Sequence, residues 1–194
     1  DVFCDKGFFN VEETAQILNA AKQYQLKPRI HGNELGITGG VQVAIAHHAL
    51  SVDHLEEIGP EEIALLSNSE TIATVLPGTS FFLGIPYAPA RKLVDAGAAI
   101  CIASDYNPGT CPNGRMSFLL SLACIKMKLL PEEALNACTI NAAFALELQD
   151  EVGSISPGKR ANLILTKTID SLARIPYTFG EDMISQVFIN ARPI

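Results

Sequence analysis

Short apolar runs and amphipathic segments alternate along most of the chain. Apolar or β-branched runs bounded by turn residues occupy residues 1–4, 27–31, 51–55, 71–76 and 98–103, which is typical of buried parallel strands. Segments with helical character lie between and after them, at residues 10–21, 39–50, 60 onward, 89–96, 113–129, 131 onward and 140–148. Repeated strand–helix units of this kind predict an α/β fold with a parallel sheet.

Cap and turn residues mark the ends of several predicted helices. Asn10 precedes Glu13 by three residues, the spacing of a capping box. Pro60 is followed by two acidic residues, an arrangement that favours the first turn of a helix. Pro77 and Gly78 close the 71–76 run, and we expect a turn there.

The character of the sequence changes after Asp150. Strand-like runs at 152–155 and 161–165 flank a Pro157-Gly158 turn, and 187–189 is one more. A complete eight-stranded (β/α)8 barrel takes about 250 residues, and only about five barrel-type strands precede this point. We therefore expect residues 1–149 to form the C-terminal half of such a barrel, and residues 150–194 to form part of a small β-sandwich.

Composition limits the class of protein and its partners. The chain has 194 residues, is 48% hydrophobic and carries a net charge of -7, which disfavours a basic nucleic-acid face. No apolar run approaches the roughly 20 residues of a membrane span. The five cysteines lack a CxxC pair, so we expect free thiols in a reducing compartment, the cytoplasm, and no thiolate zinc site.

Three predicted strands end in potential metal ligands or catalytic groups, namely His31, His54 and Asp105. Strand ends on one rim of a parallel barrel converge on one pocket, and imidazole and carboxylate groups suit Zn or Fe. Glu34 follows His31 by three residues and adds a carboxylate that could take a proton from water. Taken singly, Asp105 could equally cap a turn, and a lone histidine is more often a satisfied polar residue.

Other reactive residues have simpler interpretations. His47 and His48 are adjacent in a predicted helix, where neighbouring side chains point in different directions, so we expect a helix surface. Cys101, Cys124 and Cys138 lie in apolar surroundings and are expected to be packing residues.

At these residues the sequence resembles the amidohydrolase superfamily and, within it, the imidazolonepropionases. The resemblance runs through nearly the whole chain. Its specific parts are the segments 30–34 (IHGNE), 51–56 (SVDHLE), 76–82 (LPGTSFF) and 103–110 (ASDYNPGT). The segment 153–163 looks like the superfamily's return into its small β-sandwich.

Carried over residue by residue, the resemblance implies one divalent metal, Zn or Fe, with His31 and Asp105 as ligands. Glu34 would position and deprotonate the attacking water, with Asp105 sharing the proton transfers, and His54 would polarise the scissile carbonyl. The small-molecule substrate would be 4-imidazolone-5-propanoate, hydrolysed to N-formimidoyl-L-glutamate in histidine degradation. It would be held by Glu34, Asn107, Gly109 and Thr110.

Two departures from the family pattern bear on activity. The family's His-x-His pair, which supplies two metal ligands, does not occur in this sequence, and Asn33 stands where many relatives carry an acid. We expect Asn33 to point away from the pocket. We also expect the chain to be the C-terminal portion of a longer enzyme, inactive alone, and homo-oligomeric because open strand edges invite pairing. The alternatives are another cyclic amidohydrolase or aminohydrolase, or a non-catalytic truncated chain that only mediates association.

Overall fold

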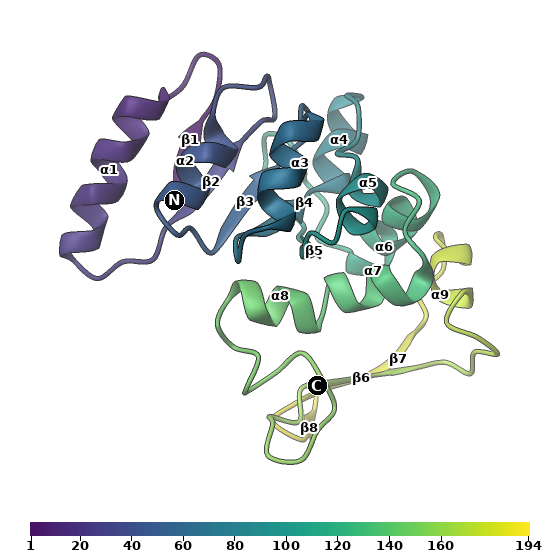
Figure 1. Cartoon of the computed structure of the whole chain (residues 1–194). Coiled ribbons are helices and arrows are strands. Elements are labelled where there is room, and N and C mark those ends of the chain that lie inside the picture. The colour runs from purple at the N-terminus through teal and green to yellow at the C-terminus, as the bar shows by residue number, and fades with distance from the viewer.

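A five-stranded parallel sheet, in the order β1-β2-β3-β4-β5, organises the larger part of the molecule (Figure 1). The computed structural model describes residues 1–194. Each strand pairs in parallel with its successor in the sequence, as expected when every connection is a helical crossover. The predicted α/β fold is therefore confirmed, with strands β1 (Val2–Cys4), β2 (Arg29–Gly32), β3 (Ser51–His54), β4 (Ile72–Val75) and β5 (Ile100–Ile102).

Helices connect these strands and then follow the last one. The helix α1 begins at the predicted capping box, in which Glu13 N–H donates to Asn10 Oδ1 at 2.9 Å and Asn10 N–H donates to Glu13 Oε2 at 3.0 Å. Pro60 and Pro131 start helices as the sequence indicates. The helices are α1 (Val11–Gln23), α2 (Gly40–Ala46), α3 (Pro60–Ser67), α4 (Pro77–Leu83), α5 (Ala90–Asp95), α6 (Met116–Ile125), α7 (Pro131–Ala137) and α8 (Ile140–Ala145).

The two faces of the sheet differ in polarity. Alternate strand residues belong to the 28-residue apolar core under the helices, among them Val2, Ile30, Val52, Val75 and Ile102. The opposite face carries a continuous row of side chains, one from each strand, because residues paired in parallel register point to the same side of the sheet. That row pairs Phe3 with His31, His31 with Asp53, Asp53 with Thr74 and Thr74 with Cys101. The polar face therefore leads to the rim at which the predicted site lies.

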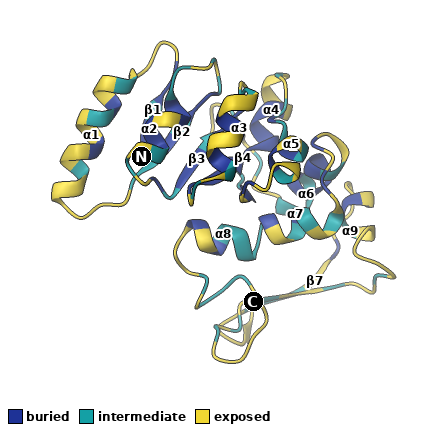
Figure 2. Cartoon of the chain, in the orientation of Figure 1, coloured by how far each residue is buried: buried dark blue, intermediate teal, exposed yellow.

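A separate antiparallel sheet follows, made of β6 (Leu163–Thr166), β7 (Ile184–Ile189) and β8 (Arg192–Pro193). Figure 2 shows that none of its strands holds a buried residue. Between β6 and β7, the short helix α9 (Arg174–Tyr177) packs on α6. The boundary between units at residues 149 and 150 stays a prediction.

Three sequence expectations about element boundaries were wrong. Residues 152–154 form bends and Ile155 is irregular, so this segment is not a strand. Gly153 adopts φ +90° and packs so tightly on α8 that an added Cβ would lie 2.7 Å from Ala143 Cβ. The helix expected over 39–50 ends at Ala46, since His48 turns left-handed with φ 54°. The long helix expected over 113–129 spans only Met116–Ile125.

The sequence predicts only a turn at Pro77-Gly78, whereas the structure begins the helix α4 there. Proline at the first helical position has a fixed φ that suits a helix start, and here it begins Pro77–Leu83 directly after β4. Gly78 is required by close packing, since a Cβ there would meet Cys111 Sγ at 2.6 Å.

No helix of the structure combines the length and the apolar character needed to cross a bilayer. All five cysteines are free thiols, as expected, and the reducing compartment stays a prediction.

Candidate active site

The two predicted metal ligands lie at the carboxyl ends of β2 and β5. His31 belongs to the polar row, and its Nδ1 lies 3.0 Å from Asp1 Oδ1. Asp105 follows β5 by three residues, with a left-handed backbone of φ 50°. The Thr79 hydroxyl donates to Asp105 Oδ2 at 2.6 Å. The Thr110 hydroxyl donates to the same oxygen at 3.4 Å, so His31 Nε2 and Asp105 Oδ1 are the atoms left for a ligand.

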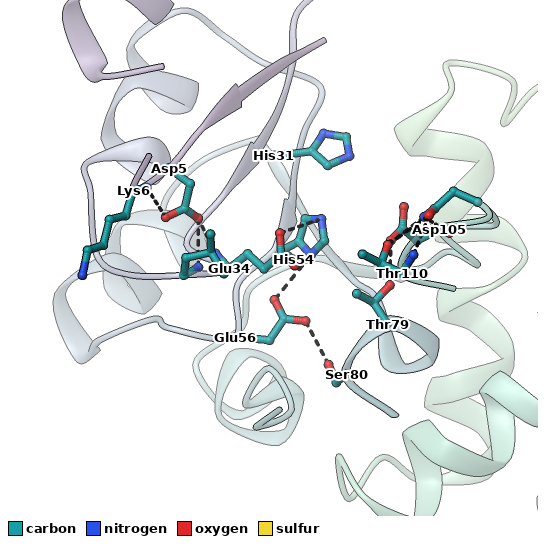
Figure 3. Close-up of polar contacts among 12 residues, drawn as sticks. Asp5, Lys6, His31, Glu34, His54, Glu56, Thr79, Ser80, Asp105 and Thr110 are labelled. Atoms are coloured by element: carbon teal, nitrogen blue, oxygen red, sulfur yellow. Dashed lines mark hydrogen bonds and ion pairs between the residues drawn. The ribbon is translucent and has the colours of Figure 1, made fainter. Parts of the chain in front are cut away.

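Glu34 and His54 face each other in the interior of the site (Figure 3). The distance from Glu34 Oε2 to His54 Nε2 is 3.7 Å, and the side chains are only 9% and 4% exposed, respectively. Strand register pairs His54 with Gly32, on the side opposite to His31. A left-handed backbone at His54, with φ 89°, breaks that alternation, and its ring centroid lies 5.2 Å from that of His31.

A buried carboxylate lies on the other side of His54. Glu56 Oε2 is 3.6 Å from His54 Nδ1, and the Glu56 side chain is 1% exposed. The Ser80 hydroxyl donates to Glu56 Oε1 at 2.9 Å. Our sequence interpretation assigned no role to Glu56, although it belongs to the 51–56 motif, and no local signal connects it with Ser80.

The helix α4 supplies hydroxyls to both carboxylates of this rim. Consecutive residues Thr79 and Ser80 donate to Asp105 and Glu56, respectively. Both hydroxyl residues are buried, at 0% and 1% exposure. The helix therefore fixes two side chains that come from different strand ends.

The loop that carries Glu34 is held by Asp5, which sequence analysis also missed. Asp5 follows β1 and is 4% exposed. Its Oδ2 accepts hydrogen bonds from the backbone N–H of Glu34 at 2.7 Å and of Leu35 at 3.1 Å. The position of the Glu34 side chain thus depends on a strand two elements away in the sequence.

Asn33 ties this loop to the one after β3. Its side-chain amide donates to the Glu57 carbonyl at 2.9 Å, and Glu57 N–H donates back to the Asn33 carbonyl at 2.7 Å. The Asn33 side chain is directed to the loop after β3, a structural task that the sequence did not reveal.

Burial and neighbouring charges shift two pKa values. Burial raises the pKa of Glu34; Glu56, Asp5 and Asp105 raise it further, while His54 opposes them. Burial disfavours the His54 cation, but Glu56 and Glu34 outweigh this effect and raise the His54 pKa. The arrangement therefore favours a site in which a proton is shared between carboxylate and imidazole groups.

The loop after Asp105 is held by its own polar groups. Asn107 Oδ1 accepts from the N–H groups of Gly109 at 2.9 Å and Thr110 at 2.7 Å. Its amide donates to the Asp105 carbonyl at 2.7 Å and to Thr110 Oγ1 at 2.9 Å. This turn shapes the rim beside Asp105, and the substrate-binding role of Asn107, Gly109 and Thr110 stays a prediction.

The remaining reactive residues lie elsewhere. His47 caps the end of α2 and His48 follows it, so the expectation that both lie within the helix was wrong. Burial raises the pKa of Cys101 and of Cys138 to about 11, and it raises the pKa of Cys124 as well. These thiols behave as packing residues, as expected.

Comparison with known proteins identifies the family. The sequence profile described as the amidohydrolase family matches residues 6–194. This chain belongs to the amidohydrolase family. An imidazolonepropionase from Christiangramia forsetii is 50% identical over 194 residues, covering 100% of this chain and 47% of the relative. One from Flavobacterium johnsoniae gives the same identity and coverage. The amidohydrolase chain thus spans about half the length of these relatives.

Solved structures agree on the fold. A zinc-bound adenosine deaminase from Xanthomonas campestris superposes with a TM-score of 0.79 at 20% identity, over 97% of this chain and 50% of that chain. The five-stranded sheet and its helices therefore have the architecture of about half of an amidohydrolase barrel enzyme.

The donor types of this amidohydrolase chain fit a divalent metal. His31 offers an imidazole nitrogen and Asp105 a carboxylate oxygen on the same rim, and both types suit Zn or Fe. The remaining atoms are oriented by hydrogen bonds, as metal ligands require: Asp1 Oδ1 accepts from His31 Nδ1–H, and the Thr79 hydroxyl donates to Asp105 Oδ2. No group of three or more His, Cys, Asp or Glu side chains is arranged to hold an ion, so these two would supply only part of a donor set.

Proposed function

We propose that this chain forms part of a metal-dependent hydrolase that opens the ring of 4-imidazolone-5-propanoate to give N-formimidoyl-L-glutamate. The observation that carries the proposal is the buried pair of Glu34 and His54, 3.7 Å apart. The 50% identity to imidazolonepropionases supports the substrate.

Glu34 is the general base in this proposal. Its carboxylate takes a proton from water as the water oxygen bonds to the carbonyl carbon of the ring. The raised pKa of Glu34 suits this task, because a base works best when its pKa approaches the working pH. The Asp5 hydrogen bonds to the loop fix the direction from which Glu34 reaches the water.

His54 stabilises the oxyanion that forms when the carbonyl carbon becomes tetrahedral. Its imidazolium is favoured by two carboxylates, Glu34 and Glu56. A positioned N–H donor of this kind acts mainly on the transition state, where the negative charge is largest.

Ring opening completes the reaction. The ring carbon–nitrogen bond breaks, and its electron pair goes to the nitrogen, which receives the proton held by Glu34. The carbonyl carbon becomes a carboxylic acid, whose proton passes to Asp105. Water is thereby divided between the new carboxylate and the released nitrogen.

His31 and Asp105 would hold the metal, together with donors from outside these 194 residues. When bound, a divalent metal supplies positive charge that lowers the pKa of water and polarises a carbonyl. The loop with Asn107, Gly109 and Thr110 lies beside Asp105 and would bind the propionate-bearing end of the substrate, with Glu34 on the other side.

A chimeric enzyme tests the proposal. In this chimera, the 194-residue chain replaces the aligned segment of the Christiangramia forsetii relative. We expect it to bind a divalent metal and to hydrolyse 4-imidazolone-5-propanoate. The hydrolysis is measured as the loss of the substrate's ultraviolet absorbance. The unmodified relative is the control.

Hydantoins and guanine are assayed in parallel, because they represent other cyclic amides and aminohydrolase substrates. A folded, metal-loaded chimera that prefers either of them, while the unmodified relative turns over imidazolone propionate, contradicts the proposed substrate.

A further inference from the structure

Glu56 is a buried carboxylate of the site that the proposed hydrolysis does not use. Its side chain is 1% exposed, so neither substrate nor bulk water reaches it. Its Oε1 accepts the Ser80 hydroxyl. Its Oε2 and His54 Nδ1 have no hydrogen-bond partner within 3.5 Å, and they face each other at 3.6 Å.

We propose that Glu56, held by Ser80, is a positioning residue that sets the orientation of the His54 ring. This inference rests on the proposed function, because it assigns Glu56 a task through His54. Figure 3 shows a chain of contacts that runs in space from Ser80 to Glu56, then to His54 and finally to Glu34.

Hydrogen-bonding chemistry fixes which ring atom faces which carboxylate. An ionised carboxylate only accepts hydrogen bonds, so the ring nitrogen beside Glu56 must carry a hydrogen. With Nδ1–H directed to Glu56, Nε2 is presented to Glu34 and the reacting groups. A flipped ring would place carbon atoms against both carboxylates, so that neither Glu34 nor Glu56 would face a ring nitrogen.

The backbone explains why His54 needs such a partner. Both His54 and Leu55 have left-handed backbones, with φ of 89° and 68°, a conformation that side-chain-bearing residues rarely adopt. Strained residues of this kind persist when their surroundings hold them. Leu55 is fully buried and its N–H donates to Gly32 O at 3.3 Å, while Glu56 holds the side chain.

Stability alone does not account for the carboxylate. Burying a charge is costly unless a partner compensates it, and an apolar residue of similar size is often at least as stable. Glu57, the next residue, has the same chemistry but is exposed. The charge of Glu56 therefore acts on His54, and Glu57 provides a matched control.

Nitrogen NMR of the histidine rings in the 194-residue chain tests the orientation without any turnover. In Glu56→Gln we expect the His54 Nδ1 and Nε2 signals to shift, because an amide can donate as well as accept. Ser80→Ala should cause a smaller shift in the same direction, and Glu57→Gln should cause none. If a folded Glu56→Gln chain, with unchanged circular dichroism, leaves both signals in place, the proposal is wrong. Should Glu56→Gln not fold, unchanged signals in Ser80→Ala overturn it equally.

Kinetics of the chimeric enzyme separate positioning from a general structural effect. We expect Glu56→Gln to lower kcat roughly 10–100-fold, the usual cost of losing a group that orients an active histidine, with KM changed less than about threefold. In a His54→Asn background the same change should alter kcat less than about twofold, because its target is gone. An equal loss in both backgrounds contradicts the proposal. If the chimera does not turn over the substrate at all, the proposed function fails, while the NMR result still decides the role of Glu56.

Discussion

Glu34 Oε2 lies 3.7 Å from His54 Nε2, although Glu34 follows β2 and His54 ends β3. The approach depends on two backbone features, the Asp5 hydrogen bonds to the Glu34 loop and the left-handed φ of His54. The proposed base and the proposed hydrogen-bond donor are thereby brought together from residues 20 positions apart in the chain.

Replacing Glu34 with Gln removes a base without changing the shape of the side chain. In the chimeric enzyme we expect kcat to fall by roughly 10²–10⁴, the usual contribution of a general base. The metal content should stay unchanged, since Glu34 is not a proposed ligand. Steady-state rates and elemental analysis measure both. The exposed Glu57→Gln is the control, and metal loss in Glu34→Gln would exclude its role as the base.

Asp105→Ala should behave differently, because the lost oxygen is a proposed metal ligand. We expect both metal content and rate to fall, since metal affinity depends on each ligand. Metal per chain is measured by elemental analysis of the chimeric enzyme after dialysis. Asp150→Ala, in an exposed turn, is the control. A variant that keeps its full metal content would show that Asp105 does not bind the ion.

Asp5→Asn tests how the Glu34 loop is held. The amide can turn its oxygen toward the N–H groups of Glu34 and Leu35, but its NH₂ then faces Lys6 N–H, which the carboxylate accepts at 2.7 Å. A buried donor left facing a donor costs about 1–3 kcal/mol. We expect the free energy of unfolding of the chain to fall by this amount in urea titrations. Asp150→Asn should change it by less than about 0.5 kcal/mol, and equal values for both variants would contradict the assignment.

Cys101 should resist alkylation in the folded chain. Its pKa of about 11 leaves about 0.1% thiolate at pH 8, and only the thiolate reacts. Iodoacetamide labelling followed by peptide mass spectrometry measures this. Unfolding in urea should expose all five thiols, so that Cys101 is labelled at the rate of the others. Rapid labelling of Cys101 without urea would contradict its buried position.

The isolated chain should associate with itself. The strands β1 and β5 each pair with one neighbour only, and unpaired strand edges favour pairing with another chain. Apolar residues of the small sheet, Ile164 and Leu165, are 63% and 56% exposed, which adds to this tendency. Sedimentation velocity over a dilution series should show dimers or larger species. If the chain sediments as a single monomeric species and binds no apolar dye, the predicted self-association is wrong.

The sequence by itself determined the five parallel strands and most of the helices between them, and it pointed to three candidate residues at the strand ends. The apolar runs and capping signals are local, because strand and helix periods are set within a few residues. They placed the five parallel strands, the start of α1 at Asn10, and His31, His54 and Asp105 at strand ends. The rule that parallel strand ends meet on one rim was sufficient to expect them on the same side of the sheet.

Only the tertiary structure decided which residues hydrogen-bond to the groups of the candidate site and so fix their positions. Ser80 contacts Glu56 across 24 positions and Asp5 contacts Glu34 across 29, and such pairs follow from the positions of loops and helices around the sheet, which no local pattern encodes. The same reason explains the absent strand at 152–155, whose alternation fits a strand. Its Gly153 packs on α8 instead, because a strand requires a neighbouring strand as well as a pattern.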